Sequence, residues 1–256
     1  MFNINRIINF LKKDNKYVFA RIYHELQKGG NRFRYLFLRS SFYRDKISTR
    51  IDQRLGQKIM KGLFFSQFAP SLFDQDYRGK IIDLADQFHK HYFKFLGSGW
   101  VALGSDIDWS KDFKSGIRWG NKYCHSFNYY NLKANLRLRS DVKIPWELSR
   151  FQYLFPMAQA FLFTKDEKYI NKIKFFIRDW IQKNPFGYSI NWACTMDVAL
   201  RAISWILMFD LLKNEKQFIG DSDFVRTLIG EIYMHGLFVE ENLEKSDING
   251  NHYLSD

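Results

Sequence analysis

Three side chains near the C-terminal end of the sequence could do chemistry on an acidic sugar. Asn249, Asn251 and His252 follow a long helical pattern and lie close together in the chain. Amides donate and accept hydrogen bonds and an imidazole titrates near neutral pH, so the three could hold a carboxylated sugar and move a proton. Neighbours on a helix point about 100° apart, so Asn251 and His252 reach one substrate only if a helix ends or begins near Gly250. A polar turn followed by a packed histidine fits the same residues.

Two charged pairs lie on predicted helices in the middle of the chain. Glu147 and Arg150 are three residues apart, and Asp197 and Arg201 are four apart. At these spacings each pair is first of all a local ion pair, which contributes little by itself. Arg201 stands among apolar residues, where a long cation is costly unless it is paired or faces a cavity.

Three ordered motifs resemble the N-terminal domain of the heparinase II/III family of polysaccharide lyases. They are the run KIPWELSR from Lys143 to Arg150, the pair Asn191-Trp192 followed by Arg201, and the Asn-His pair at 251–252. The similarity extends from about Ile81 to the C-terminus. It implies an α/α toroid, in which helical hairpins surround a long cleft, and a β-elimination reaction at a uronic acid.

The resemblance also implies roles for individual residues. β-Elimination removes a proton next to a carboxylate, and a group that donates a hydrogen bond to this carboxylate spreads the developing charge. Asn251 takes this role by resemblance, while His252 either shares it or acts as the base. The helix that carries Arg201 lies beside the cleft in the family, so we expect Arg201 to bind a sugar carboxylate or sulfate through two hydrogen bonds. The predicted substrate-binding residues are Trp146, Glu147, Arg150, Asn191, Trp192, Arg201 and Asn249.

Part of the family's catalytic set has no counterpart in this sequence. Family members use a tyrosine, and usually a second histidine, beyond the Asn-His pair, and the tyrosine protonates the departing glycosidic oxygen. Tyr253 does not match that tyrosine. We therefore expect a fragment without the later toroid hairpins and the C-terminal β-sandwich, inactive on its own. No metal or cofactor is expected.

The positive charge of the chain is concentrated near its N-terminus. The net charge is +12, and residues 1–62 hold +11 of it, from fifteen Lys or Arg against four Asp or Glu. Residues 63–256, the predicted partial toroid, are therefore almost neutral, and net charge says little about a polyanionic substrate. A basic arm with interspersed aromatic residues fits contact with an anionic membrane surface, nucleic acid or a protein; nucleic acid is not the expected partner. A solvated packing arm fits the pattern equally well.

Cysteine content and apolar runs give little information about the compartment. Cys124 and Cys194 fit either one disulfide or two thiols. No apolar run reaches the 18 residues of a transmembrane helix. The start of the sequence lacks the apolar core of a signal peptide, whereas the resemblance implies a periplasmic protein. The compartment therefore stays open.

Helical spacing of apolar residues predicts an all-α protein of antiparallel hairpins. Hairpins alone also fit a solenoid or a bundle, so the ring arrangement comes from the resemblance. The glycine-rich residues 97–130 are predicted to be irregular, with short strands. The helix over 194–212 is apolar nearly all round, so we expect deep burial, and we expect His89, His91 and His235 at the surface. The predicted helices span residues 4–27, closed by Gly29-Gly30-Asn31, then 81–96, 145–162, 166–181, 194–212 and 222–243.

Two other classes of function fit the same sequence. A non-catalytic helical module could bind anionic polysaccharide or a membrane surface through the basic arm. An α/α-toroid glycoside hydrolase would need paired carboxylates in its cleft, for which Glu147 and Asp197 are the candidates.

Overall fold

The computed structural model describes residues 29–40, 68–129 and 140–243. Helices dominate these ranges, where the single sheet has two short strands, so the predicted all-α class is confirmed. The predicted helix over 4–27 and the residues Asn249, Asn251 and His252 lie outside the described residues. The elements are η1 (Pro70–Leu72), α4 (Gln75–His89), β1 (Tyr92–Phe93), β2 (Val101–Ala102), η2 (Cys124–Ser126), α6 (Lys143–Ser149), α7 (Leu154–Thr164), α8 (Lys168–Lys183), η3 (Ile190–Trp192), α9 (Thr195–Leu212), α10 (Lys216–Ile219) and α11 (Ser222–Glu241).

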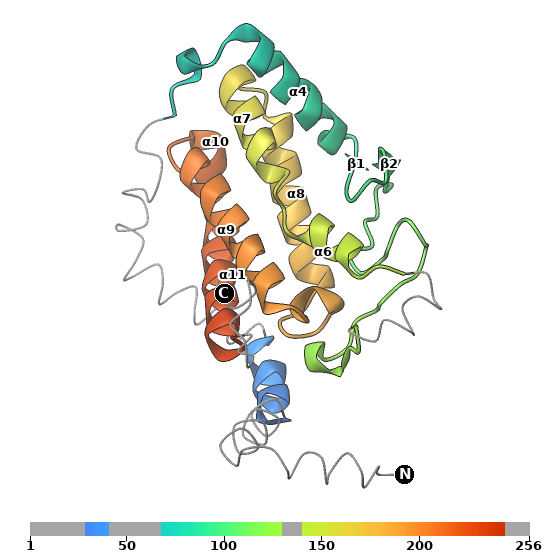
Figure 1. The fold of residues 1–256 in the computed structure, drawn as a ribbon. Helices are drawn as coiled ribbons and strands as arrows, with labels where there is room; N and C mark the ends of the chain where they lie inside the picture. The colour runs from blue at the N-terminus through green and yellow to red at the C-terminus, as the bar shows by residue number, and fades with distance from the viewer. Residues whose placement is uncertain (1–28, 41–67, 130–139, 244–256) are drawn as a thin grey trace, which may run out of the picture.

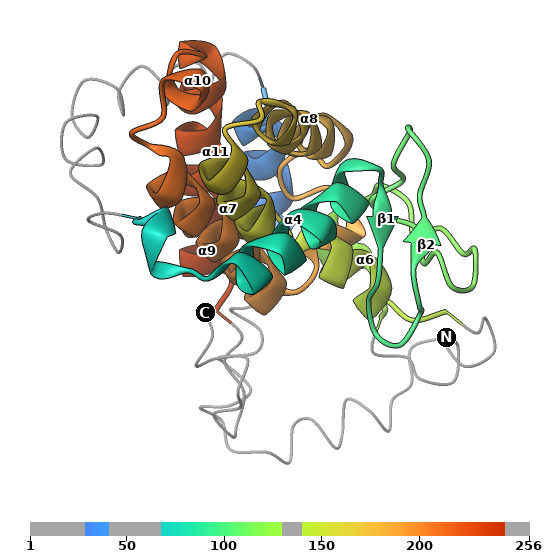
Figure 2. The same cartoon turned by 90° about the horizontal axis from the view of Figure 1, so that it is seen from above.

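Helix α7 lies at the centre of the helical layer. It packs against α4, α8 and α9, and α9 packs against α11 (Figures 1 and 2). A short turn joins α7 to α8, and the hydroxyl of Thr195 at the start of α9 donates to the carbonyl of Asn242 just after α11, at 2.7 Å. Both helix pairs are therefore antiparallel, as predicted, and α7 and α9 begin at the same end of the molecule.

The single helix predicted from Pro145 to about Leu162 is in fact two helices, α6 and α7. Pro156 explains the break, because it has no N–H to donate to the carbonyl four residues earlier and its ring clashes there. It is tolerated in the first turn of α7, where that N–H would have no partner. Between the helices Phe151 has a left-handed φ of 60°, held by complete burial of its ring.

Helix α4 begins and ends earlier than the predicted helix over 81–96. The carboxylate of Asp74 caps its first turn by accepting from the backbone N–H of Tyr77 at 2.7 Å. At its end His91 adopts a φ of 63°, and the chain turns into the β1–β2 hairpin. His91 is buried rather than on the surface, because its ring contacts the carbonyl of Gly104 and accepts from the ammonium of Lys172.

Residues 29–38 form a helix, so the predicted helix end at Gly29-Gly30-Asn31 is wrong. Glycine costs a helix about 1 kcal/mol relative to alanine, and burial of one helix face outweighs this. Tyr35 and Leu38 belong to the main apolar cluster, and the hydroxyl of Tyr35 accepts from the amide of Asn242 at 2.7 Å. This part of the basic arm is therefore docked on the helical body.

The core is rich in aromatic side chains, and Trp109, Trp180, Trp192 and Trp205 are almost completely buried. Most of the aromatic excess therefore serves packing. Cys124 and Cys194 are also buried, but in two different apolar clusters and without a disulfide between them.

Helix α9 matches its predicted bounds but not its predicted burial. Ile203 is 48% exposed, and Leu200 and Leu207 are only partly buried, so one apolar face lies open. None of the helices in the described part of the chain combines the length and apolar character needed to cross a membrane.

The contact between Gly187 and Tyr35 should be sensitive to one added methyl group. Gly187 has a φ of +70°, and a Cβ there would lie 2.3 Å from the Tyr35 ring. Gly120 has a similar φ of +74° with open space around it. We expect Gly120→Ala to lower the free energy of unfolding by about 1 kcal/mol through backbone strain, and Gly187→Ala by about 1–3 kcal/mol more. Urea denaturation of both variants checks this; equal losses would contradict the docking of helix 29–38.

Candidate functional site

Helix α6, the start of α9 and the end of α11 meet at one end of the helical layer (Figure 1). The indole N–H of Trp146 donates to the carbonyl of Ile190 at 2.8 Å, which joins α6 to η3. Arg150, just after α6, contacts Asp197 in the first turn of α9. With the bond between Thr195 and Asn242, these contacts bring two of the three sequence motifs together.

Arg150 is held between two carboxylates. Its Nε donates to Oδ1 of Asp197 at 2.6 Å, and its Nη1 pairs with Glu147 as predicted. The side chains of Arg150 and Glu147 are 16% and 19% exposed, whereas Asp197 is almost fully buried. Burial opposes the charge of Arg150, but Asp197 and then Glu147 outweigh it and raise the pKa of the guanidinium. Arg150 is thus a fixed cation whose Nη2 has no hydrogen-bond partner among the described residues.

Asp197 pairs with Arg150. The partner predicted from helical spacing was Arg201, four residues later on the same helix. The position of Asp197 in the first turn of α9 places a negative charge at the positive end of the helix dipole. Oδ2 of Asp197 is buried and accepts no hydrogen bond in the described structure. The three residues Glu147, Arg150 and Asp197 are called the arginine cluster below. Its accessible groups are the free Nη2 of Arg150 and the partly exposed carboxylate of Glu147.

Arg201 is completely buried, away from solvent and from the pockets of the described structure. Its guanidinium lies 4.1 Å from the ring centre of Trp180 and 5.3 Å from that of Trp192. Nε donates to Nε2 of His235 at 2.9 Å, and Nη2 donates to the carbonyl of Asn191 at 3.0 Å. Burial lowers the pKa of Arg201 to about 9, against the opposing effect of Asp197, so the group is charged at neutral pH. In this structure a sugar can reach Arg201 only by displacing the indoles.

The three other candidates in this region are buried as well. Asn191 is fully buried, and its amide donates to the carbonyl of Trp109 and to Oδ1 of Asn184, both at 2.9 Å. Trp192 is fully buried and Trp146 is 6% exposed. Neither tryptophan presents a ring face on which a sugar could stack, so all three hold the scaffold together in this structure.

His235, predicted at the surface, is fully buried on α11. Because its Nε2 accepts from Arg201, its Nδ1 carries the proton and donates to the carbonyl of Glu231 at 2.6 Å. Sequence inspection missed this partnership, as it missed the pair of Arg150 and Asp197. The apolar surroundings of both Arg201 and His235 were the available signal, since two buried polar groups tend to satisfy each other.

Comparison with known proteins shows the family to which the chain belongs. The family model described as Heparinase II/III N-terminus matches residues 39–256. The chain belongs to this family. A heparan sulfate lyase HepC from Pedobacter heparinus and a mutant of it each share 22% identity with a TM-score of 0.53, over 94% of this chain and 31% of theirs. A heparinase III with methylated lysines shares 22% identity with a TM-score of 0.50, over 69% of this chain and 26% of its own. Among curated proteins, none matches.

The family model shows the family, whereas the similarities to solved structures, at 22% identity, show the fold alone. The chain spans about a third of the length of the lyases that it resembles. Within the family, the arginine cluster lies in two of the motifs that carried the resemblance, and Asn249, Asn251 and His252 carry the third. The last three lie outside the described residues, so their roles stay predictions.

The same substitution at the two arginines should separate their roles in this heparinase II/III domain. Arg201→Lys loses the contacts with His235 and Asn191 and the fit between the indoles, so we expect it to lower the free energy of unfolding by about 2 kcal/mol or more. Arg150→Lys keeps a partly exposed cation beside Glu147 and Asp197 and should cost about 1 kcal/mol or less. Urea denaturation measures both values. A larger loss for Arg150→Lys would contradict the structural role of Arg201.

Proposed function

We propose that this chain is the part of a polysaccharide lyase that holds a uronic-acid-containing glycan for β-elimination. The observation that carries this proposal is the arginine cluster, a fixed cation with an unused donor edge where α7 and α9 begin. Family membership supports the lyase class. The glycan could be similar to heparan sulfate, to alginate or to a bacterial exopolysaccharide, which share the uronic acid.

The charges of the arginine cluster define what it can recognise. Glu147 and Asp197 together more than offset the charge of Arg150, so the cluster does not act as a free positive charge. Nη2 of Arg150 can donate to a sugar oxygen, and the partly exposed carboxylate of Glu147 can accept from a sugar hydroxyl, whereas the carboxylate of Asp197 is buried. We infer that the arginine cluster binds the hydroxyl groups of the sugar, while other residues neutralise the carboxylate of the sugar.

Asn251 and His252 are the proposed neutralising groups. Asn242, which accepts from Thr195 beside the arginine cluster, precedes Asn251 by nine residues. Nine residues extend at most about 30 Å, so chain length allows the pair to reach this end of the molecule. A donor from Asn251 or a protonated His252 would stabilise the carboxylate while a base takes the proton from C5, and a neutral His252 would instead be that base. The electrons then form the C4–C5 double bond, and the glycosidic oxygen leaves C4 and takes up a proton from a general acid.

Binding of matched glycans tests the proposal. The probes are an oligosaccharide of glucuronate and N-acetylglucosamine, and the same oligosaccharide with its carboxylates reduced to alcohols. We expect the chain to bind the acidic probe about tenfold more tightly by titration calorimetry, because only that probe carries the group that Asn251 and His252 neutralise. Asn251→Ala should remove this preference and keep the affinity for the reduced probe.

Arg150→Lys should lower the affinity for both probes by about tenfold, because the ammonium of lysine cannot reproduce the planar donor edge of arginine. Arg226→Lys serves as the control, because Arg226 is an exposed arginine on α11 that pairs with Asp223, and it should leave both affinities unchanged. Equal binding of the two probes by the unmodified chain, or no binding of either, would contradict the proposed function.

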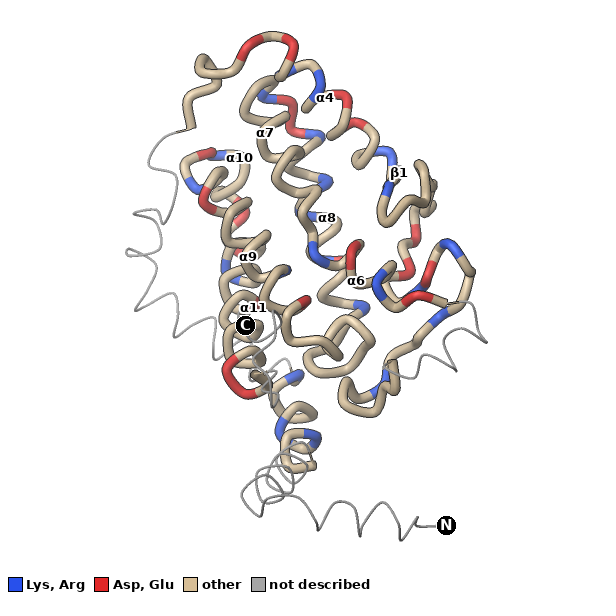
Figure 3. Tube along the Cα trace, viewed as in Figure 1, with Lys and Arg blue, Asp and Glu red and all other residues tan. Residues whose placement is uncertain are grey.

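A different surface favours the alternative of a non-catalytic binding module. On helix 29–38, Phe33 and Phe37 are 78% and 56% exposed on the face opposite the docked Tyr35. Arg32 and Arg39 are also exposed, and Figure 3 marks basic positions along this part of the chain. Aromatic side chains flanked by arginines suit a membrane surface rich in anionic lipid, or an anionic polysaccharide.

A further inference from the structure

One surface pocket of the described structure has a polar lining, and no role described so far uses it. It has a volume of about 360 Å³, within the range of small-ligand sites. The loop over 106–110, the segment over 118–121 and the C-terminal end of α8 form its walls. Its polar lining includes Asp106, Asp108, Ser110, Arg118, Asn121 and Lys183, and we call it the loop–α8 pocket.

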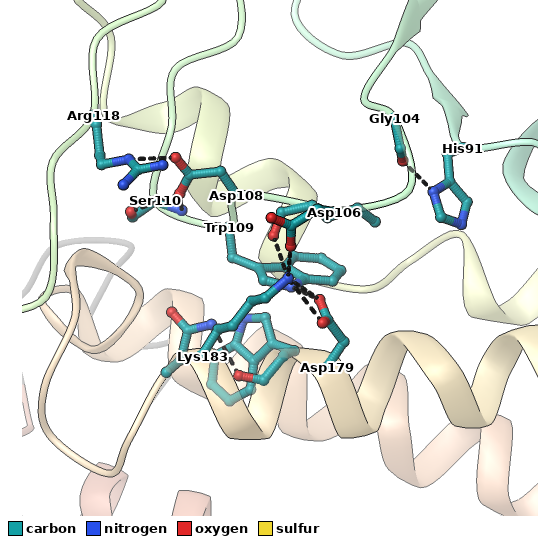
Figure 4. A network of polar contacts seen from close by, with 12 residues as sticks. His91, Gly104, Asp106, Asp108, Trp109, Ser110, Arg118, Asp179 and Lys183 are labelled. Atoms are coloured by element: carbon teal, nitrogen blue, oxygen red, sulfur yellow. Dashed lines mark hydrogen bonds and ion pairs between the residues drawn. The ribbon is translucent and has the colours of Figure 1, made fainter.

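The walls of this pocket are fixed by the protein's own contacts. In Figure 4 the ammonium of Lys183 lies between Asp106 and Asp179, with an N–O distance of 2.5 Å to Asp106. The same ammonium donates to the carbonyl of Ile107 at 3.0 Å, and the indole of Trp109 donates to Asp179 at 2.7 Å. A pocket that is already rigid loses little conformational freedom when a ligand binds.

Charge within the pocket favours hydroxyl groups over an acidic group. Lys183 has its donors occupied by Asp106, Asp179 and Ile107, and Arg118 donates through Nε to Asp108 at 2.6 Å. The two cations are paired with three carboxylates, those of Asp106, Asp108 and Asp179, so the pocket carries no free positive charge for an acidic group. Arg118 is 69% exposed and its Nη groups have no hydrogen-bond partner among the described residues. This combination of donors and acceptors matches the vicinal hydroxyls of a sugar.

One buried residue connects the pocket to the candidate site. The amide of Asn191 donates to the carbonyl of Trp109 in the pocket wall, while its neighbour Ile190 accepts from Trp146 of α6. α8 ends and α7 begins at this same end of the helical layer (Figure 1). Neighbouring residues of η3 therefore hold both the pocket wall and α6, and a ligand that contacts both regions would have to be a long glycan.

We propose that the loop–α8 pocket binds a second sugar residue of the glycan through its hydroxyl groups. This rests on the proposed function, because it assumes that the chain binds a glycan at the arginine cluster. The pocket acts as a remote subsite, so it contributes to the binding of long glycans and not of short ones. Arg118 and Asn121 are its exposed contact residues.

The test compares a tetrasaccharide and a dodecasaccharide of glucuronate and N-acetylglucosamine in calorimetric titrations. We expect the double variant Arg118→Ala, Asn121→Ala to bind the dodecasaccharide about tenfold more weakly and the tetrasaccharide as the unmodified chain does. The loss should persist at high salt, because hydrogen bonds to hydroxyls are screened less than charge attraction. Arg226→Ala is the matched control, since Arg226 is an exposed arginine on α11 that pairs with a nearby aspartate, Asp223. It should change neither affinity.

Two results would overturn the subsite. One is an unchanged affinity of the double variant for the dodecasaccharide; the other is an equal loss for both probes. If Arg150→Lys weakens binding while the double variant does not, the subsite fails and the proposed function stands. If the unmodified chain binds neither probe, both fail together.

Discussion

A guanidinium group buried between two indole rings determines how the rest of this structure is arranged. Burying a charge costs several kcal/mol unless hydrogen bonds and nearby charges offset it. Arg201 is offset by His235 on α11, the carbonyl of Asn191 in η3 and the rings of Trp180 and Trp192. These partners come from α8, η3 and α11, so the cation can stay buried only if the three elements keep their positions around α9.

The arginine cluster and the loop–α8 pocket both depend on η3, the segment to which Arg201 donates a hydrogen bond. Ile190 accepts from Trp146 and so positions α6, which precedes Arg150. Asn191 donates to the carbonyl of Trp109 and so positions the loop that lines the loop–α8 pocket. Groups that recognise a sugar must be held in place by residues behind them, and here a continuous set of buried polar contacts provides this support. The fully buried Arg201 therefore holds the scaffold, and the partly exposed Arg150 is the arginine proposed to contact the sugar.

The sequence was most informative where one physical rule acts alone. Apolar periodicity predicted α8, α9 and α11 to within two residues at each end. Asp221 caps α11, with its carboxylate accepting from the N–H of Phe224 at 3.1 Å. The all-α class and the irregular segment over 97–130 followed from the same patterns. Prediction failed where an interaction distant in sequence decides the outcome. Burial of Tyr35 keeps Gly29 and Gly30 helical. The division of the predicted helix over 145–162 has a local cause instead, the missing N–H of Pro156.

The sequence predicted which residues form the site better than it predicted which of them pair with each other. Arg150 and Glu147 were expected to pair and do so, but the partner of Asp197 lies 47 residues earlier in the chain and cannot be read from helical spacing. The exposure of Arg201 also could not be predicted, because a cation among apolar residues fits a cavity wall as well as a buried network.

Hydrogen exchange tests most directly whether an acidic glycan binds at the arginine cluster, where α7 and α9 begin. With the glucuronate dodecasaccharide, the account predicts slower exchange over residues 143–152 and 189–197 and no change over 216–226. Protection confined to residues 29–40 would contradict it and favour the binding module.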